Sequence, residues 1–186
     1  MELLLSIALG VGLAASAGFR VFVPLLFTSL AVHFGLVQVA TGFQWIGTWT
    51  ALAVLLAATV AEIGGYYIPW LDNLLDTIAA PTAVAAGTLL TTSFVEIDNP
   101  VLHWGLGLIM GGGTAGFIQI GTTLTRLAST KLSGGLANPV VSTVENGLAI
   151  GLSLLTFWLP LIALALVFLL VVWLGRRLLK KGNSSQ

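Results

Sequence analysis

Charged side chains interrupt segments of this sequence that are otherwise apolar. Arg20 lies in the stretch SAGFRVFVP, and Glu62 and Glu145 occupy comparable positions in later apolar runs. An ionised side chain at the centre of a bilayer costs about 3 kcal/mol, so such residues normally face the interior of a helix bundle and have a partner. Arginine stays protonated in proteins, whereas a buried carboxyl group can take up a proton. The three residues are therefore candidates for a substrate or coupling-ion role, and the alternative is a buried ion pair that only fixes packing.

Two more acidic residues, Asp72 and Asp76, lie in the polar stretch YYIPWLDNLLD. A spacing of four places both on one face of a helix, with Cβ atoms about 5–6 Å apart. Such a pair can share a proton or hold a divalent cation, which makes both residues substrate, coupling or metal candidates. The alternative is that they complement the dipole of a helix N-terminus. Their spacing also occurs in polyprenyl-transferring enzymes, but no second acidic motif accompanies them here.

A second polar stretch combines two cations, a glycine-rich turn and an expected helix start at an Asn-Pro pair. Cations, glycine-rich backbone and helix N-termini all favour anions. The anion-binding candidates are Arg126, Lys131, Ser133, Gly134, Gly135 and Asn138. The alternative is a positively charged cytoplasmic loop that only sets the topology.

The composition is that of an integral membrane protein. Of the 186 residues, 57% are hydrophobic and 8% are charged, against about 25% charged in ordinary globular domains. The net charge of zero argues against a nucleic-acid partner. Because there is no cysteine, disulfides and thiolate metal sites are excluded, and we predict no cofactor.

Apolar runs predict an all-α protein with about six transmembrane helices in a single polytopic domain, residues 1–182, followed by a soluble tail, 183–186. The runs are 3–33, 47–68, 74–92, 100–125, 138–157 and 159–175. The first run is too long for one simple crossing, so we expect it to tilt strongly or break, at 16–18 or at Pro24.

Short strings recur in the two halves of the chain, 1–97 and 98–182. SAGF at 16–19 matches TAGF at 114–117, and Glu62-Ile-Gly matches Glu145-Asn-Gly. Two three-span halves must insert with opposite topology, which is the inverted-repeat design of many secondary transporters. We therefore expect two inverted repeats with broken opening helices, the second break falling at the triple glycine 111–113. Chance matching of such short strings is the alternative.

The positive charges predict the orientation. The C-terminal Arg and Lys residues should be cytoplasmic, whereas 33–46 and 93–99 contain neither Lys nor Arg and should lie outside. With six spans, both termini are expected in the cytoplasm.

Four strings resemble a bacterial membrane family catalogued as domain of unknown function 4126: AGFRVFVPLL, YYIPWLDNLLDTIAAP, GGGTAGFIQ and GGLANPVVSTVEN. The resemblance covers nearly the whole chain and implies a small protein of the bacterial inner membrane. It supplies no activity and no catalytic residues.

Paired halves, broken helices and intramembrane charges favour a small secondary transporter or permease for a solute or ion. Two alternatives remain. The chain is a non-transporting scaffold or subunit, or it is an intramembrane enzyme for lipids or isoprenoids that uses Asp72 and Asp76 with a metal. The expected partner is the lipid bilayer, and self-association into a homo-oligomer stays open.

Overall fold

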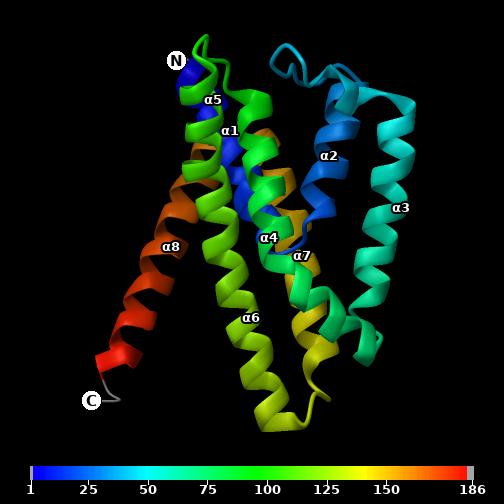
Figure 1. Cartoon of the computed structure of the whole chain (residues 1–186), viewed down its shortest axis with the longest axis vertical. Helices are drawn as coiled ribbons and strands as arrows, with labels where there is room; N and C mark the ends of the chain where they lie inside the picture. Colours follow the sequence, from blue (N-terminus) through cyan, green and yellow to red (C-terminus); the bar gives the residue numbers. More distant parts are fainter. Residues whose placement is uncertain (1, 184–186) are drawn as a thin grey trace.

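The structure is a computed structural model that describes residues 2–183, and its regular elements are helices (Figure 1). They are α1 (Glu2–Ala17), α2 (Phe22–His33), η1 (Gln44–Gly47), α3 (Trp49–Gly65), α4 (Pro69–Phe94), α5 (Pro100–Leu106), η2 (Gly107–Gly112), α6 (Gly113–Ser133), α7 (Asn138–Trp158) and α8 (Pro160–Asn183). The expected soluble tail therefore begins at the end of a helix, and its residues 184–186 lie outside the described residues.

Three helical segments are long and apolar enough to span a membrane: Leu74–Phe94, Pro100–Ser133 and Asn138–Trp158. Shorter apolar helices cover Leu3–Ala17, Phe22–His33, Trp49–Gly65 and Pro160–Arg176. The chain is thus a helical membrane protein, as its composition predicts, and the later apolar runs each correspond to a helix.

The first apolar run does not form one broken span. Figure 1 shows α1 descending from the N-terminal end of the molecule, the chain reversing near mid-height, and α2 returning towards the same end. We call this unit the hairpin and residues 18–21 its tip. The reversal precedes Pro24, which lies buried in the first turn of α2, where a missing N–H breaks no helical hydrogen bond. The prediction of a break near 16–18 was correct, and the break at Pro24 was wrong.

Small residues let the hairpin insert between α4 and α6. A methyl group at Gly18 would lie 2.6 Å from the carbonyl oxygen of Ala115 and 2.7 Å from Cβ of Ile118, so only glycine permits this approach. Gly10 packs equally closely on Thr91 of α4. The hairpin tip is therefore held deep inside the bundle by helix contacts that depend on small residues.

The two pairs of matched strings of the expected inverted repeat do not agree on the direction of their helices. The strings at 16–19 and 114–117 belong to α1 and α6, which run in the same direction in Figure 1, whereas the strings at Glu62 and Glu145 belong to α3 and α7, which run in opposite directions, as an inverted repeat requires. The triple glycine 111–113 also does not break its helix. The π-helical turn η2 passes into α6 without interruption there, because its glycines allow close packing against Gly87 and Thr91 of α4.

The two termini lie at opposite ends of the long axis (Figure 1). The connections after α2 and after α4 share the end of the N-terminus, and the connection between α6 and α7 lies at the other end with the C-terminus. This arrangement differs from the expectation that both termini share one side. The physical reason is that the hairpin enters the bundle and leaves it without crossing.

Candidate functional site

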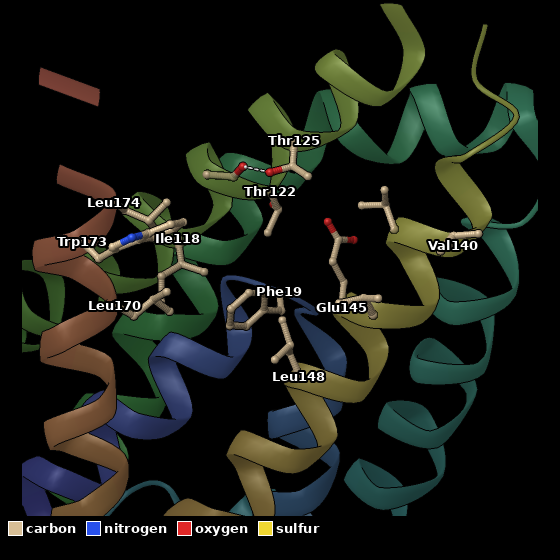
Figure 2. A pocket seen from close by; sticks show the side chains of 13 residues that line it. Phe19, Ile118, Thr122, Thr125, Val140, Glu145, Leu148, Leu170, Trp173 and Leu174 are labelled. Atoms are coloured by element: carbon tan, nitrogen blue, oxygen red, sulfur yellow. Dashed lines mark hydrogen bonds between the residues drawn. The ribbon is translucent and has the colours of Figure 1, made fainter. Parts of the chain in front are cut away.

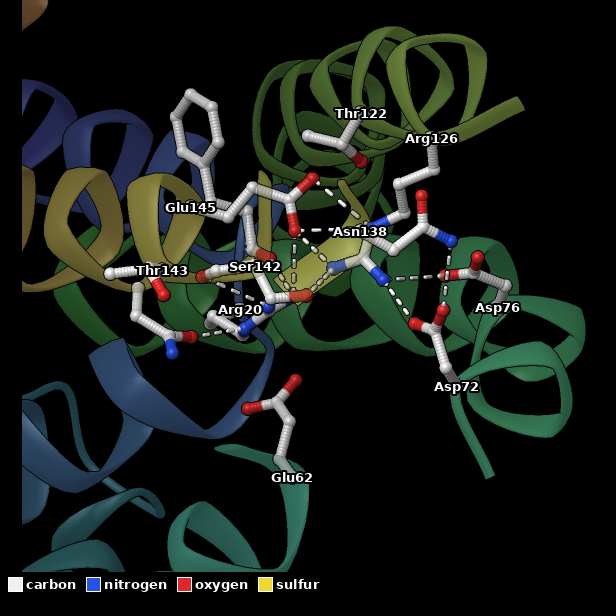
Figure 3. A network of polar contacts seen from close by, with 12 residues as sticks. Arg20, Glu62, Asp72, Asp76, Thr122, Arg126, Asn138, Ser142, Thr143 and Glu145 are labelled. Atoms are coloured by element: carbon white, nitrogen blue, oxygen red, sulfur yellow. Dashed lines mark hydrogen bonds and ion pairs between the residues drawn. The ribbon is translucent and has the colours of Figure 1, made fainter. Parts of the chain in front are cut away.

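The hairpin tip places Arg20 at the centre of a buried polar site, with 2% of its surface exposed (Figure 3). Its guanidinium pairs with the Glu145 carboxylate of α7 at 3.0 Å and donates from Nε to Asn146 Oδ1 at 2.5 Å. It also donates to the carbonyl oxygens of Phe19, at 3.2 Å, and Ser142, at 3.3 Å. Arg20 therefore has a buried carboxylate partner in Glu145.

Arg126 of α6 is the second arginine of the site and is also buried. It forms hydrogen-bonded ion pairs with Asp72 of α4 and with Glu145, and it lies 3.7 Å from Asp76. A further hydrogen bond, of 3.2 Å, reaches Ser142 Oγ. Glu145 therefore bridges both arginines, and we call Arg20, Asp72, Asp76, Arg126 and Glu145 the ion network.

The Tyr66 ring holds the two like charges near each other. The guanidinium carbon of Arg20 lies 3.9 Å from the ring centroid, and that of Arg126 lies 4.1 Å from it. The negative face of an aromatic ring attracts a cation, most strongly away from water. Tyr66 therefore offsets part of the repulsion between the arginines without adding a formal charge.

Glu62 of α3 lies beside the start of α2. Its two carboxylate oxygens accept the backbone N–H groups of Val21, at 2.7 Å, and Phe22, at 2.9 Å. These groups begin α2 and have no partner within the helix. Glu62 thus caps α2 and fixes the hairpin tip, whereas the ion pair of Arg20 is made with Glu145.

The ion network contains one more carboxylate than guanidinium. Asp72, Asp76 and Glu145 face two arginines, and the Asp76 Oδ1 atom has no hydrogen-bond partner. Since arginine keeps its proton, this charge can be balanced by a proton on a carboxyl group, by a bound cation or by water at Asp76, whose side chain is 22% exposed.

Asp72 and Asp76 share a helical face, as their spacing predicts, but their common partner is the Arg126 guanidinium. Among residues 2–183, no group of three His, Cys, Asp or Glu side chains is placed to hold a metal ion. Because the Arg126 guanidinium lies next to both carboxylates, Asp72 and Asp76 do not fit a divalent metal site.

The structure separates the residues expected to bind an anion. Arg126 faces carboxylates, whereas Lys131 is exposed at the end of α6. Ser133 Oγ accepts the backbone N–H of Ala137 at 3.1 Å, and the Asn138 amide donates to Asp72 Oδ2 at 3.3 Å. Asn138 consequently binds a carboxylate rather than capping α7. The glycines of the turn, Gly134 and Gly135, have positive φ angles of 62° and 88°.

Two cavities border the ion network. The polar cavity, of about 310 Å³, lies at the end of the molecule that carries the C-terminus, and its walls include Tyr66, Asp72 and Asn138. The apolar cavity, of about 370 Å³, lies between α6, α7 and α8, and Glu145 forms part of its wall (Figure 2). The ion network therefore separates a polar space from an apolar one.

Residues 7–181 match the family model described as Domain of unknown function (DUF4126). The chain belongs to this family. No curated protein and no solved structure matches the chain.

In this DUF4126 member, sequence reasoning identified every charged residue of the ion network but missed three neutral ones. Tyr66, Ser142 and Asn146 each contact an arginine. Two of them had a signal in the sequence, because Tyr66 begins the polar stretch around Asp72, and Asn146 follows Glu145 in the recurring string. Ser142 had none, since a single serine in an apolar helix is common.

Proposed function

We propose that the chain is a small proton-coupled secondary transporter of the bacterial inner membrane, with the ion network as its coupling site. One observation carries the proposal. A buried network that is one positive charge short lies between a polar cavity and an apolar cavity, at the tip of a hairpin that does not cross the bundle. A charge deficit of this kind suits exchange of a proton for a substrate.

Glu145 is the expected switch of the transporter. Its Oε2 atom accepts from Arg20 at 3.0 Å and also from Arg126. Protonation of this carboxyl would weaken both ion pairs at once, because a neutral acid no longer attracts either guanidinium. The hairpin, α6 and α7 would then be free to move relative to one another. Each further cycle would break both ion pairs in the same way, so no other titratable group is needed.

The position of the network suits alternating access. The polar cavity gives access to Asp72 from the end with the C-terminus, and residues between the hairpin and α4 close the opposite side, including the buried Thr28 and Thr91. Release of the hairpin tip from Glu145 would open that side. Transport sites near mid-membrane, next to interrupted helices, follow the same design.

The scaffold alternative explains the ion pairs but does not explain the two cavities beside them. The enzyme alternative loses its metal site, because Arg126 occupies the space between Asp72 and Asp76. Transport accounts for both the surplus carboxylate and the cavities.

The test is the solute-driven proton current, meaning the proton flux that a pH-sensitive dye enclosed in proteoliposomes reports, in vesicles that contain the full chain, at an imposed pH gradient and with a panel of sugars, amino acids, organic acids and organic amines. Wild-type protein should give currents with at least one class, and Glu145→Gln should abolish them. Glu96→Gln is the matched control, because Glu96 is exposed in the connection after α4. Currents that are absent for every class, or unchanged in Glu145→Gln, would contradict coupled transport and favour the scaffold.

A further inference from the structure

The side chains that line the apolar cavity differ in charge from those of the ion network as a whole. Its charged wall residue is Glu145, and neither arginine contributes to the wall. The other wall residues are mainly aliphatic and aromatic, and they include Phe19 from the hairpin tip and Trp173 from α8 (Figure 2). A ligand in this cavity meets a carboxylate, not a guanidinium.

The hydroxyl groups of the cavity also favour a positive ligand. Thr122 Oγ donates to the carbonyl oxygen of Gln119 at 2.9 Å, and Thr125 Oγ donates to that of Gly121 at 2.9 Å. With their protons used, these hydroxyls present lone pairs to the cavity. Apart from the indole N–H of Trp173, the polar side chains of the wall therefore act as acceptors.

A second apolar cavity, of about 340 Å³, continues the first along α7 and α8, and the two share Phe19, Leu148 and Leu170. Gly147 and Gly151 form part of its wall and have nothing packed within 4 Å of the position of a Cβ atom. Both cavities lie between apolar helices, so a ligand can reach them from the hydrocarbon region of the bilayer.

Resting on the proposed function, we propose that the substrate is a lipophilic monovalent organic cation, bound in the apolar cavity with its charge next to Glu145. The cation takes the place of the proton that Glu145 carries in its protonated state, and this proton leaves when the cation binds. The exchange conserves charge, with one cation in and one proton out. The rings of Phe19 and Trp173 add cation–π attraction.

Several groups near Glu145 influence whether this carboxylate binds a proton or a cation. They are Arg20, Arg126, Asp72, Asp76, Glu62 and Tyr66. An anionic amphiphile would fit less well, since it would meet Glu145 before either arginine and would increase the surplus of negative charge.

The test compares tetraphenylphosphonium with tetraphenylborate, two ions of the same shape and opposite charge, by equilibrium binding to the purified full chain in detergent. Tetraphenylphosphonium should bind and tetraphenylborate should not. Binding should tighten as the pH rises, by up to about tenfold per pH unit, the limit for exchange of one proton.

Two variants test the location of the site. Val144→Trp adds a large side chain to the wall of the apolar cavity and removes no charged group of the ion network, so it should weaken tetraphenylphosphonium binding at least tenfold, as should Glu145→Gln. Val60→Trp is the matched control, because Val60 is exposed on α3 and lines none of the three cavities described above. The affinity of this variant for tetraphenylphosphonium should equal that of wild type. If Glu145→Gln does not fold, Val144→Trp decides.

Tighter binding of tetraphenylborate, or binding that Val144→Trp leaves unchanged, would overturn the proposal. Failure of the transport proposal gives a different result. Solute-driven currents without tetraphenylphosphonium binding refute only the substrate class, whereas cavity-dependent binding without any current refutes transport and keeps the cation site.

Discussion

Arg20 shows why a permanently charged side chain is tolerated within an apolar segment. Its guanidinium directs N–H groups to Glu145, Asn146 and the carbonyl oxygens of Phe19 and Ser142, so its charge is paired and each of its three nitrogen atoms has a partner. Each of these contacts except that with Phe19 reaches α7. Arg20 therefore joins the hairpin to α7 through a fork of donors that a single ammonium group does not reproduce.

Replacing Arg20 should separate stability from function. Arg20→Ala removes one of the two cations that Glu145 binds and the donor to Asn146 Oδ1, and it should cost about 3–5 kcal/mol, the usual loss when one partner of a buried pair is removed. Arg20→Lys keeps the charge, so it should lower the thermal midpoint much less while still abolishing the proton-coupled current. Thermal unfolding in detergent and the proteoliposome current measure the two effects.

Arg176→Ala is the control for Arg20→Ala, because Arg176 is exposed on α8. It should leave the midpoint unchanged. An Arg20→Ala protein as stable as wild type would show that the buried ion pair does not hold the hairpin in place.

At the scale of the element, the hairpin depends on two contacts made by different helices. Glu62 of α3 caps the start of α2, and Gly18 allows the tip to approach Ala115 of α6. The first contact fixes where α2 begins, and the second fixes how deep the tip lies. Both are needed to bring Arg20 to Glu145.

Gly18→Ala should destabilise the protein by overpacking. Its methyl group would lie 2.6 Å from the Ala115 carbonyl oxygen, a backbone atom that cannot rotate away, and overpacking of a filled core costs about 1–3 kcal/mol. Gly64→Ala is the matched control in α3, where nothing lies within 4 Å of the new methyl group. That control should be neutral or slightly stabilising, since alanine favours a helix.

The thermal midpoints of both variants, measured in the same detergent, test this prediction. Equal midpoints for Gly18→Ala and Gly64→Ala would mean that the tip is not packed against α6 as described.

At the scale of the whole molecule, the ends differ in charge. The connection after α4 contains Glu96 and Asp98, whereas the opposite end has Lys131 near the last turn of α6 and Arg176 in α8. From the positive-inside rule we predict that the end with the C-terminus lies in the cytoplasm. With a hairpin that does not cross, we predict the N-terminus on the outside, where six spans would place it in the cytoplasm.

Labelling with a membrane-impermeant maleimide tests this topology, and the absence of native cysteine makes each introduced cysteine unique. Gln38→Cys should react from outside and Lys131→Cys only after the cytoplasmic side is opened. An epitope tag at the N-terminus should be accessible from the same side as residue 38. Accessibility of that tag from the side of residue 131 would mean that α1 crosses the membrane.

The sequence by itself determined the class of the protein and the chemistry of its site. Low charge and long apolar runs require a membrane helix bundle, and the cost of an ion in lipid identifies Arg20, Glu62 and Glu145 as residues that need partners. Both inferences depend on local composition, which the sequence shows without any knowledge of the fold.

Only the tertiary structure decided which partner each charge has and which way each helix runs. Arg126 meets Asp72 across 54 residues, and Arg20 meets Asn146 across 126. The reversal at the hairpin tip is stabilised by Glu62, 41 positions after Val21. The sequence of the first apolar run alone indicates one long segment, because the residue that caps α2, and so lets it start in the opposite direction, belongs to another helix. Such contacts arise from packing, so no local pattern of residues specifies them.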